Sequence, residues 1–128
     1  MIPFEDFLKE AELRLDTCRK MAPDGSMPLN DDYQEILKLH EMLEEHEIPH
    51  VFDRIFDGWF VHYPVSGLDE ENHVCSCVQH FGSYGAFRDC LELMGLTTEE
   101  EDNPQGWLTA EDVFCRIEAH WRANRENA

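Results

Sequence analysis

Two histidines and two cysteines lie close together near the middle of the chain, at His73, Cys75, Cys77 and His80. Imidazole and thiolate groups are the ligands that zinc prefers in proteins. The cysteines are separated by a single residue, whereas a zinc knuckle spaces them by roughly two to four, and no second cysteine pair follows. Two cysteines on one face of a central strand usually belong to the core. We therefore expect no metal and no cofactor, and keep a small metal- or thiol-dependent enzyme on these residues as the alternative.

A second set of residues resembles part of a catalytic triad. Asp53 and His62 are expected to lie opposite each other on two strands, and a carboxylate that orients an imidazole is half of such a triad. Arg54 and Tyr63 are their neighbours. No nucleophile is evident, because Ser83 in Gly-Ser-Tyr-Gly lacks the glycine that a nucleophile elbow needs two residues earlier. An ordinary cross-strand pair is the favoured interpretation.

These side chains need a hairpin and a third strand to position them. From residue 50 the apolar residues alternate, and Asp57-Gly58 between two β-rich runs is a strong signal for a two-residue turn. The sequence predicts a third strand over residues 73–80 and hence a three-stranded antiparallel meander. With this turn the predicted cross-strand pairs are Phe56 with Trp59, Arg54 with Val61, Phe52 with Tyr63, Ile55 with Phe60, Asp53 with His62 and Val51 with Pro64.

Helices are expected before and after this sheet. Residues 3–22 predict an amphipathic helix, and a second helix is expected from an N-cap at Asn30 to Pro49. Residues 86–94 predict a short helix that Gly95 ends, and Thr109 opens the last helix with a start like a capping box. The apolar side chains expected to face inward on the first helix are Phe4, Phe7, Leu8, Ala11, Leu15 and Cys18.

The fold class that follows is α+β in the order ααβββαα, with residues 1–128 as a single acidic domain. A chain of 128 residues is long enough for one core and too short for two. The expected core comprises Phe7, Leu15, Ile36, Leu43, Val61, Val74, Leu91, Phe114, Ile117 and Trp121.

Charge is the strongest feature of the composition. The chain has 28 acidic and 10 basic residues, a formal net charge of −18, while 42% of its residues are hydrophobic. A chain with this share of hydrophobic residues is expected to fold. Its excess of acidic residues argues against direct binding to nucleic acid or an anionic membrane. No basic stretch with an apolar core opens the chain, and no apolar run approaches the ~18 residues of a membrane span. We expect a cytoplasmic protein with reduced cysteines.

The acidic residues are spread along the chain, with 13 in residues 1–50 and 15 in residues 51–128. A run of charge is usually a solvated surface. A folded body that displays carboxylates on all sides also presents a field like that of a nucleic acid, which attracts basic proteins. On this interpretation the partner-binding residues are Glu44, Glu45, Glu99, Glu100, Glu101, Asp102 and the aromatic Tyr84.

Three segments also suggest a family. VCSCVQHFGSYG, LELMGL and GWLTAEDVFCRIEAHW resemble small acidic proteins carried by phages and mobile elements of gut Firmicutes, over roughly residues 50–121. The resemblance brings no activity with it. It implies a context, because small acidic proteins from such elements are often inhibitors of host defence nucleases, including CRISPR effectors.

The leading functional hypothesis is therefore a non-enzymatic acidic binding protein that inhibits a nucleic-acid-binding or defence protein by mimicking nucleic acid. Its partner would be a basic protein surface, with no nucleic acid and no membrane bound directly. A homodimer or larger oligomer is a further alternative, for which the expected interface residues are Phe52, Phe56, Trp59 and Tyr63.

Overall fold

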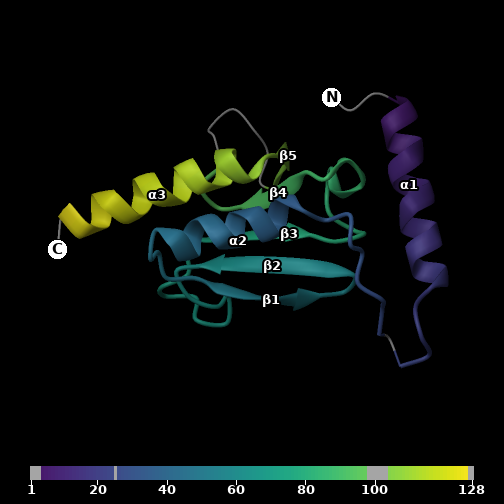
Figure 1. Cartoon of the computed structure of the whole chain (residues 1–128), viewed down its shortest axis with the longest axis horizontal. Coiled ribbons are helices and arrows are strands. Elements are labelled where there is room, and N and C mark those ends of the chain that lie inside the picture. The colour runs from purple at the N-terminus through teal and green to yellow at the C-terminus, as the bar shows by residue number, and fades with distance from the viewer. Residues whose placement is uncertain (1–3, 25, 98–103, 127–128) are drawn as a thin grey trace.

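A computed structural model of the whole chain describes residues 4–24, 26–97 and 104–126 (Figure 1). Two helices come first, five strands follow, and a long helix ends the described chain. A single turn of 3₁₀ helix, η1, lies between the third and fourth strands. The elements are α1 (Phe4–Arg19), α2 (Glu35–Glu45), β1 (Val51–Ile55), β2 (Gly58–Tyr63), β3 (Cys75–Gln79), η1 (Ala86–Arg88), β4 (Leu91–Met94), β5 (Gln105–Leu108) and α3 (Ala110–Glu126).

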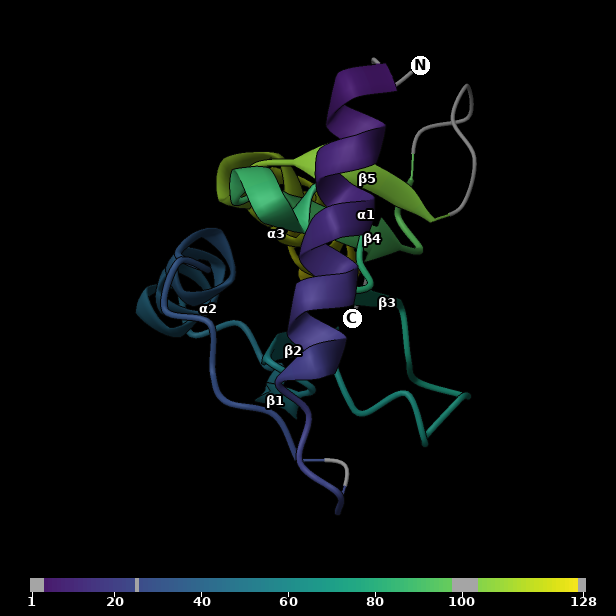
Figure 2. The ribbon, with the colours of Figure 1, turned by 90° about the vertical axis from the view of Figure 1, so that its right-hand side faces the viewer.

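The five strands form one antiparallel sheet in which each strand pairs with the next along the chain, in the order β1-β2-β3-β4-β5. Helices α2 and α3 lie side by side on one face of this sheet (Figures 1 and 2). The presence of both helices and strands agrees with the mixed α and β content predicted from the sequence. Across the described residues, no helix combines the length and the apolar character needed to cross a membrane.

The predicted order ααβββαα is wrong, because two further strands extend the sheet. Residues 86–94, expected to be a helix, form η1 and then β4. Gly85 and Asp89 on either side of η1 have left-handed backbones, with φ of 86° and 55°, which interrupts a helix. In β4, Leu91 and Leu93 are buried and Met94 is exposed, so the period is two. β5 lies between Gly95 and Thr109, where no strand is predicted from the sequence.

The β1-β2 hairpin is present, but its predicted pairing is wrong. Phe52 lies opposite Val61, and Ile55 lies opposite Gly58, so Phe56 and Asp57 are the turn residues. Gly58 is the first residue of β2, and a Cβ atom there would lie 1.8 Å from the carbonyl oxygen of Gln79 on β3. Only glycine allows this close approach of two strands.

The core lies between the sheet and the helices α2 and α3. Ile36 and Leu43 of α2, Val61 of β2 and Leu91 of β4 are each no more than 1% exposed, as expected. Phe114 and Ile117 of α3 are buried as well, whereas Val74 and Trp121 are only partly buried. The start of α3 has the predicted reciprocal cap: the Asp112 backbone N–H donates to Thr109 Oγ1, and the Thr109 N–H donates to Asp112 Oδ2.

Helix α2 begins later than predicted, and Asn30 is not its cap. The carboxylate of Asp89, far along the chain, accepts hydrogen bonds from the backbone N–H groups of Gln34 and Glu35 at 2.8 and 3.0 Å. Asp89 Oδ1 also accepts a hydrogen bond from Gln79 Nε2 at 2.8 Å. A residue beside η1 therefore satisfies the free N–H groups at the start of α2.

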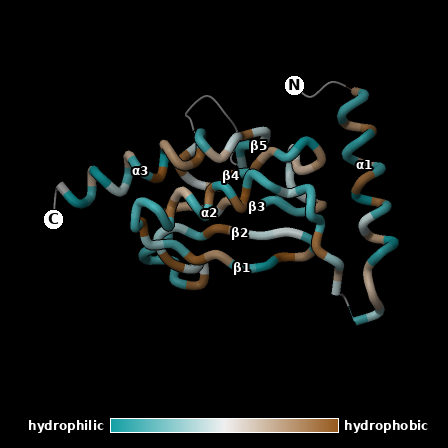
Figure 3. Tube along the Cα trace, viewed as in Figure 1, coloured by the Kyte–Doolittle hydropathy of each residue, from teal (hydrophilic) through white to brown (hydrophobic). Residues whose placement is uncertain are grey.

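Helix α1 lies across one end of the strands, to the side of the body (Figures 1 and 2), and its orientation is the reverse of the prediction. Its apolar residues face solvent, with Phe4 73%, Phe7 56% and Leu15 59% exposed. In Figure 3 the trace of α1 alternates between hydrophobic (brown) and hydrophilic (teal) residues. Its polar side faces the loop before η1 instead, where Glu10 is 4% exposed.

Candidate functional site

The strand that carries the two cysteines is structural. Cys75 and Cys77 lie on the face of β3 that the helices cover, and are 1% and 0% exposed. Burial raises the pKa of Cys75 to about 12 and that of Cys77 well above its ordinary value, so neither is a thiolate at neutral pH. His73 hydrogen-bonds Val65 O and Ser76 Oγ, while His80 hydrogen-bonds the N–H of Gly82. The structure does not bring the four predicted residues together.

The predicted Asp53–His62 pair does not form. Asp53 lies opposite Phe60, and His62 lies between Val51 and Ser76 on its two neighbouring strands. The neighbour Arg54 hydrogen-bonds the carbonyl oxygen of Met27. The Asp–His pairing that a triad would need is therefore absent from this hairpin.

Ser83 is also structural. It is fully buried, its hydroxyl donates to the carbonyl oxygen of His80 at 2.8 Å, and it accepts a hydrogen bond from the His80 N–H at 3.0 Å. Both contacts close the turn that follows β3. A buried hydroxyl held in this way is not placed to attack a substrate.

Three of the four hairpin aromatic residues expected at an oligomer interface are buried or partly buried within the chain. Tyr63 is 1% exposed and hydrogen-bonds His120 at 2.8 Å. Phe52 stacks on the rings of His40 and Trp59, with centroids 4.0 and 4.8 Å away. Phe56 is the exception, at 51% exposed.

The predicted partner-binding residues divide among three places. Glu44 and Glu45 are exposed on α2. Tyr84, 45% exposed, lies in the loop before η1 and not on α2. The remaining predicted residues lie outside the described part of the chain: Glu99, Glu100, Glu101 and Asp102.

Four acidic residues lie close together in sequence at the C-terminal end of α2. Glu41, Glu44, Glu45 and Glu47 are all exposed, and we call them the α2 acidic face. No basic residue lies in the last turn of the helix. Negative charge at a helix C-terminus is unfavourable, because the helix dipole places its own negative end there. This end of α2 is therefore a place where a cation or a basic group would be stabilised.

The backbone at the C-terminal end of α2 is also strained, at Glu47. The Glu47 N–H donates to Glu44 O at 3.1 Å and the Ile48 N–H donates to Leu43 O at 3.0 Å, which is the pattern of a Schellman motif. Glu47 occupies the left-handed position of this motif with a φ of 54°. Glycine or asparagine is the usual residue there, because a Cβ atom raises the energy of this conformation.

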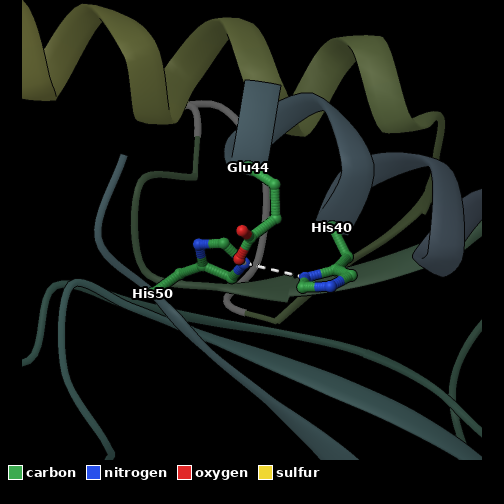
Figure 4. Close-up of side chains that lie close together, drawn as sticks. All are labelled: His40, Glu44 and His50. Carbon is green, nitrogen blue, oxygen red and sulfur yellow. Dashed lines mark hydrogen bonds and ion pairs between the residues drawn. The ribbon is translucent and has the colours of Figure 1, made fainter. Parts of the chain in front are cut away.

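Beside the α2 acidic face, two histidines and a carboxylate converge (Figure 4). His40 and Glu44 lie one turn apart on α2, and His50 comes from the segment that leads into β1. His40 Nδ1 lies 2.8 Å from His50 Nε2, which lies 3.5 Å from Glu44 Oε1. Burial, and then the neighbouring His50, lower the pKa of His40. The neutral form of the His40 ring is therefore favoured.

The sequence contains a signal for this cluster, although the cluster is not among the sites predicted from it. Two residues separated by four positions share a helix face, as His40 and Glu44 do, and His50 follows directly after the Pro49 that ends the helical segment. A histidine on a helix face that is otherwise apolar usually belongs to the core or its boundary, and His40 fits that pattern. The missing information was the turn at Glu47, which folds His50 back toward α2.

In comparisons with known proteins, no family model, no curated protein and no solved structure matches the chain.

Proposed function

We propose that this chain is a non-enzymatic acidic binding protein that uses the α2 acidic face, and that its partner is a basic surface on a nucleic-acid-binding protein such as a defence nuclease. The observation that carries the proposal is the set Glu41, Glu44, Glu45 and Glu47. Their charges oppose the helix dipole, and Glu47 adds a left-handed backbone. Local arrangements that lower stability are typical of functional sites.

The rest of the surface supports the same proposal. Among the described residues, five ion pairs join a lysine or arginine to a carboxylate, whereas the whole chain has 28 acidic residues. Ion pairs leave the formal net charge of the chain unchanged at −18. Such a field speeds the approach of a basic surface and competes with nucleic acid for it.

The buried cysteines and Ser83 support a function without catalysis. The thiols of Cys75 and Cys77 are protonated at neutral pH because burial raises their pKa, and the Ser83 hydroxyl is engaged by His80. The residues that suggested enzyme chemistry in the sequence thus serve the core and a turn.

The test is affinity capture from a lysate of the organism that encodes the chain, followed by binding measurements on the purified captured protein. Glu41→Gln, Glu45→Gln and Glu47→Gln together remove three charges from the α2 acidic face. We expect this triple variant to lower the affinity by about tenfold or more, because each charge pair across an interface contributes electrostatic energy. Added salt and duplex DNA should weaken the wild-type complex as well.

A matched control removes the same charge elsewhere. Asp69, Glu70 and Glu71 are exposed in the loop between β2 and β3, and their change to Asn, Gln and Gln should alter the affinity by less than about threefold. Equal losses in the two triple variants would assign the binding to net charge alone. A complex insensitive to salt and to DNA would refute the proposal.

A further inference from the structure

The side chains of His40, Glu44 and His50 are of the types that bind metal ions. The cluster also lies beside the α2 acidic face. Two imidazoles and a carboxylate are ligands of Zn²⁺ and its neighbours Co²⁺ and Ni²⁺, whereas Mg²⁺ and Ca²⁺ prefer oxygen ligands alone. The ligand atoms of the three residues all lie within 4.8 Å of one another. Ligands about 2.0–2.2 Å from one tetrahedral ion lie about 3.3 Å apart, so small side-chain rotations suffice to surround an ion.

The histidines are held in place by their other contacts. His50 Nδ1 lies 2.8 Å from the carbonyl oxygen of Ile48. A carbonyl only accepts hydrogen bonds, so Nδ1 carries the proton and Nε2 presents its lone pair toward the cluster. His40 is stacked on the ring of Phe52, with an interplanar angle of 9°. This support from outside the ligand set is what natural metal sites use to orient imidazoles.

The electrostatic surroundings favour a cation. The His50 side chain is 3% exposed and Glu44 is 64% exposed, so the cluster opens to solvent on the glutamate side. Glu41, Glu45 and Glu47 are exposed in the same stretch of chain, toward the negative end of α2. The geometry points to a zinc-class divalent metal site formed by His40, Glu44 and His50, with a remaining coordination position open to water.

The test is a titration of the isolated full-length chain with ZnCl₂ and, for spectroscopy, CoCl₂. Protein without a histidine tag is used, and the exposed cysteines are replaced (Cys18→Ser, Cys115→Ser) because thiols bind zinc on their own. We expect one ion per chain with a dissociation constant of about 1 μM or lower. The visible cobalt bands should report nitrogen and oxygen ligands, and the affinity should fall as the pH drops below about 6.5.

Variants identify the ligands. Glu44→Gln should weaken zinc binding by about tenfold or more, whereas Glu45→Gln removes the same charge one residue away and should weaken it by less than about threefold. His40→Gln should abolish binding, while His46→Gln, exposed on the same helical segment, should not. Glu44 is exposed, so its variant keeps the test valid even if a change at the buried His50 unfolds the chain.

Three outcomes would overturn the metal site. They are absence of one-to-one binding at 100 μM metal (a deliberately high, order-of-magnitude limit for a zinc-class site), equal losses in Glu44→Gln and Glu45→Gln, and cobalt bands unchanged by His40→Gln. Because no partner protein is present, failure here leaves the proposed binding function standing, and the reverse is also true.

A second inference comes from a different element, α1. Residues 4–20 carry five acidic and four basic residues, so this segment is close to neutral while the other residues carry the remaining net charge of −17. Its apolar residues repeat at the seven-residue spacing of a coiled coil, Leu8 with Leu15 and Phe4 with Ala11 and Cys18; all are exposed except Ala11, which is partly buried. Two strongly negative bodies can approach each other most readily through such a segment.

The charges beside the apolar stripe select an orientation. Glu5, Glu12 and Arg19 lie seven residues apart on one flank, acidic at the start of α1 and basic at its end. In an antiparallel pair the Glu5 end of one helix faces the Arg19 end of the other, whereas in a parallel pair like charges meet. We infer that a second copy of this chain covers the apolar side of α1 in an antiparallel pair.

Sedimentation equilibrium tests this pairing. The small contact predicts a weak dimer with a dissociation constant of about 1–100 μM. Leu8→Gln with Leu15→Gln should give a monomer of unchanged circular dichroism, since both side chains are exposed. Glu5→Lys should weaken the dimer, and Glu5→Lys with Arg19→Glu should restore it. A monomeric wild type at about 1 mM, or a double charge exchange that restores nothing, would refute the antiparallel dimer.

Discussion

Helices α1 and α2 use their two faces in opposite ways. In α2 the apolar residues Ile36, Leu39 and Leu43 are fully buried and the acidic residues face solvent. In α1 the apolar residues face solvent, and Glu10 and Thr17 are the buried residues. Both helices are amphipathic, yet only α2 contributes to the main core.

The difference arises from what each helix meets on the body. α2 lies over the apolar face of β2 and β3. α1 meets the polar loop before η1, where Arg14 donates to the carbonyl oxygens of Phe81 and Gly82, and Asp6 pairs with Arg88 at 2.6 Å. An amphipathic pattern therefore shows that a helix has two faces, whereas the complementary surface decides which face turns inward.

The largest expected effect tests this difference directly. Leu39→Ala should lower the free energy of unfolding by about 3 kcal/mol, because it leaves a cavity in the core. Leu15→Ala in α1 should lower it by about 0.5 kcal/mol or less, since this side chain is 59% exposed. Urea unfolding of dilute protein measures both values. Similar losses in the two variants would show that α1 packs with its apolar face inward.

A smaller effect is expected at the start of α2. Asp89→Gly keeps the left-handed backbone possible but removes the acceptor for the N–H groups of Gln34 and Glu35. We expect a loss of about 2 kcal/mol in the free energy of unfolding, and a smaller loss for Asp89→Asn, which retains an acceptor. Asp69→Gly in the exposed β2-β3 loop is the control. A loss at Asp89 no larger than the control would disprove the cap.

Mild acid should distinguish the two helices, because α2 contains His40 whereas α1 has no histidine. The pKa of His40 is lowered in the folded state from 6.5, chiefly by burial. Its contribution to stability is thus complete above pH 6.5 and is lost as the pH falls through the folded pKa. Between pH 7.5 and 5.5 the amide signals around His40 should change in NMR spectra while those of α1 stay constant. His40→Gln should remove this part of the response.

Local features of the fold were predictable from the sequence. The hairpin, the burial of Ile36 and Leu43 in α2 and the Thr109 cap of α3 depend on neighbouring residues, and the structure confirms them. The strands β4 and β5 were not predictable, because four-residue strands carry little periodic signal. The register of the hairpin depended on the approach of Gly58 to Gln79, a contact between strands far apart in sequence.

The residues of the candidate site show the same division. The acidic residues Glu44 and Glu45 could be read from composition and helix periodicity. The approach of His50 to His40 could not, because it depends on the left-handed turn at Glu47, where the sequence offers neither glycine nor asparagine. A residue placed against its conformational preference is the kind of feature that sequence patterns predict poorly.

The smallest expected effect tests the central claim, that the end of α2 keeps acidic residues at a cost in stability. The measurement is the free energy of unfolding at low ionic strength for the wild type, Glu47→Gln and Glu47→Gly. We predict that Glu47→Gln is more stable than the wild type by about 0.5 kcal/mol, because a charge opposing the helix dipole is removed. Glu47→Gly should gain about 0.5 kcal/mol more through its φ of 54°. A wild type more stable than both variants would contradict the account.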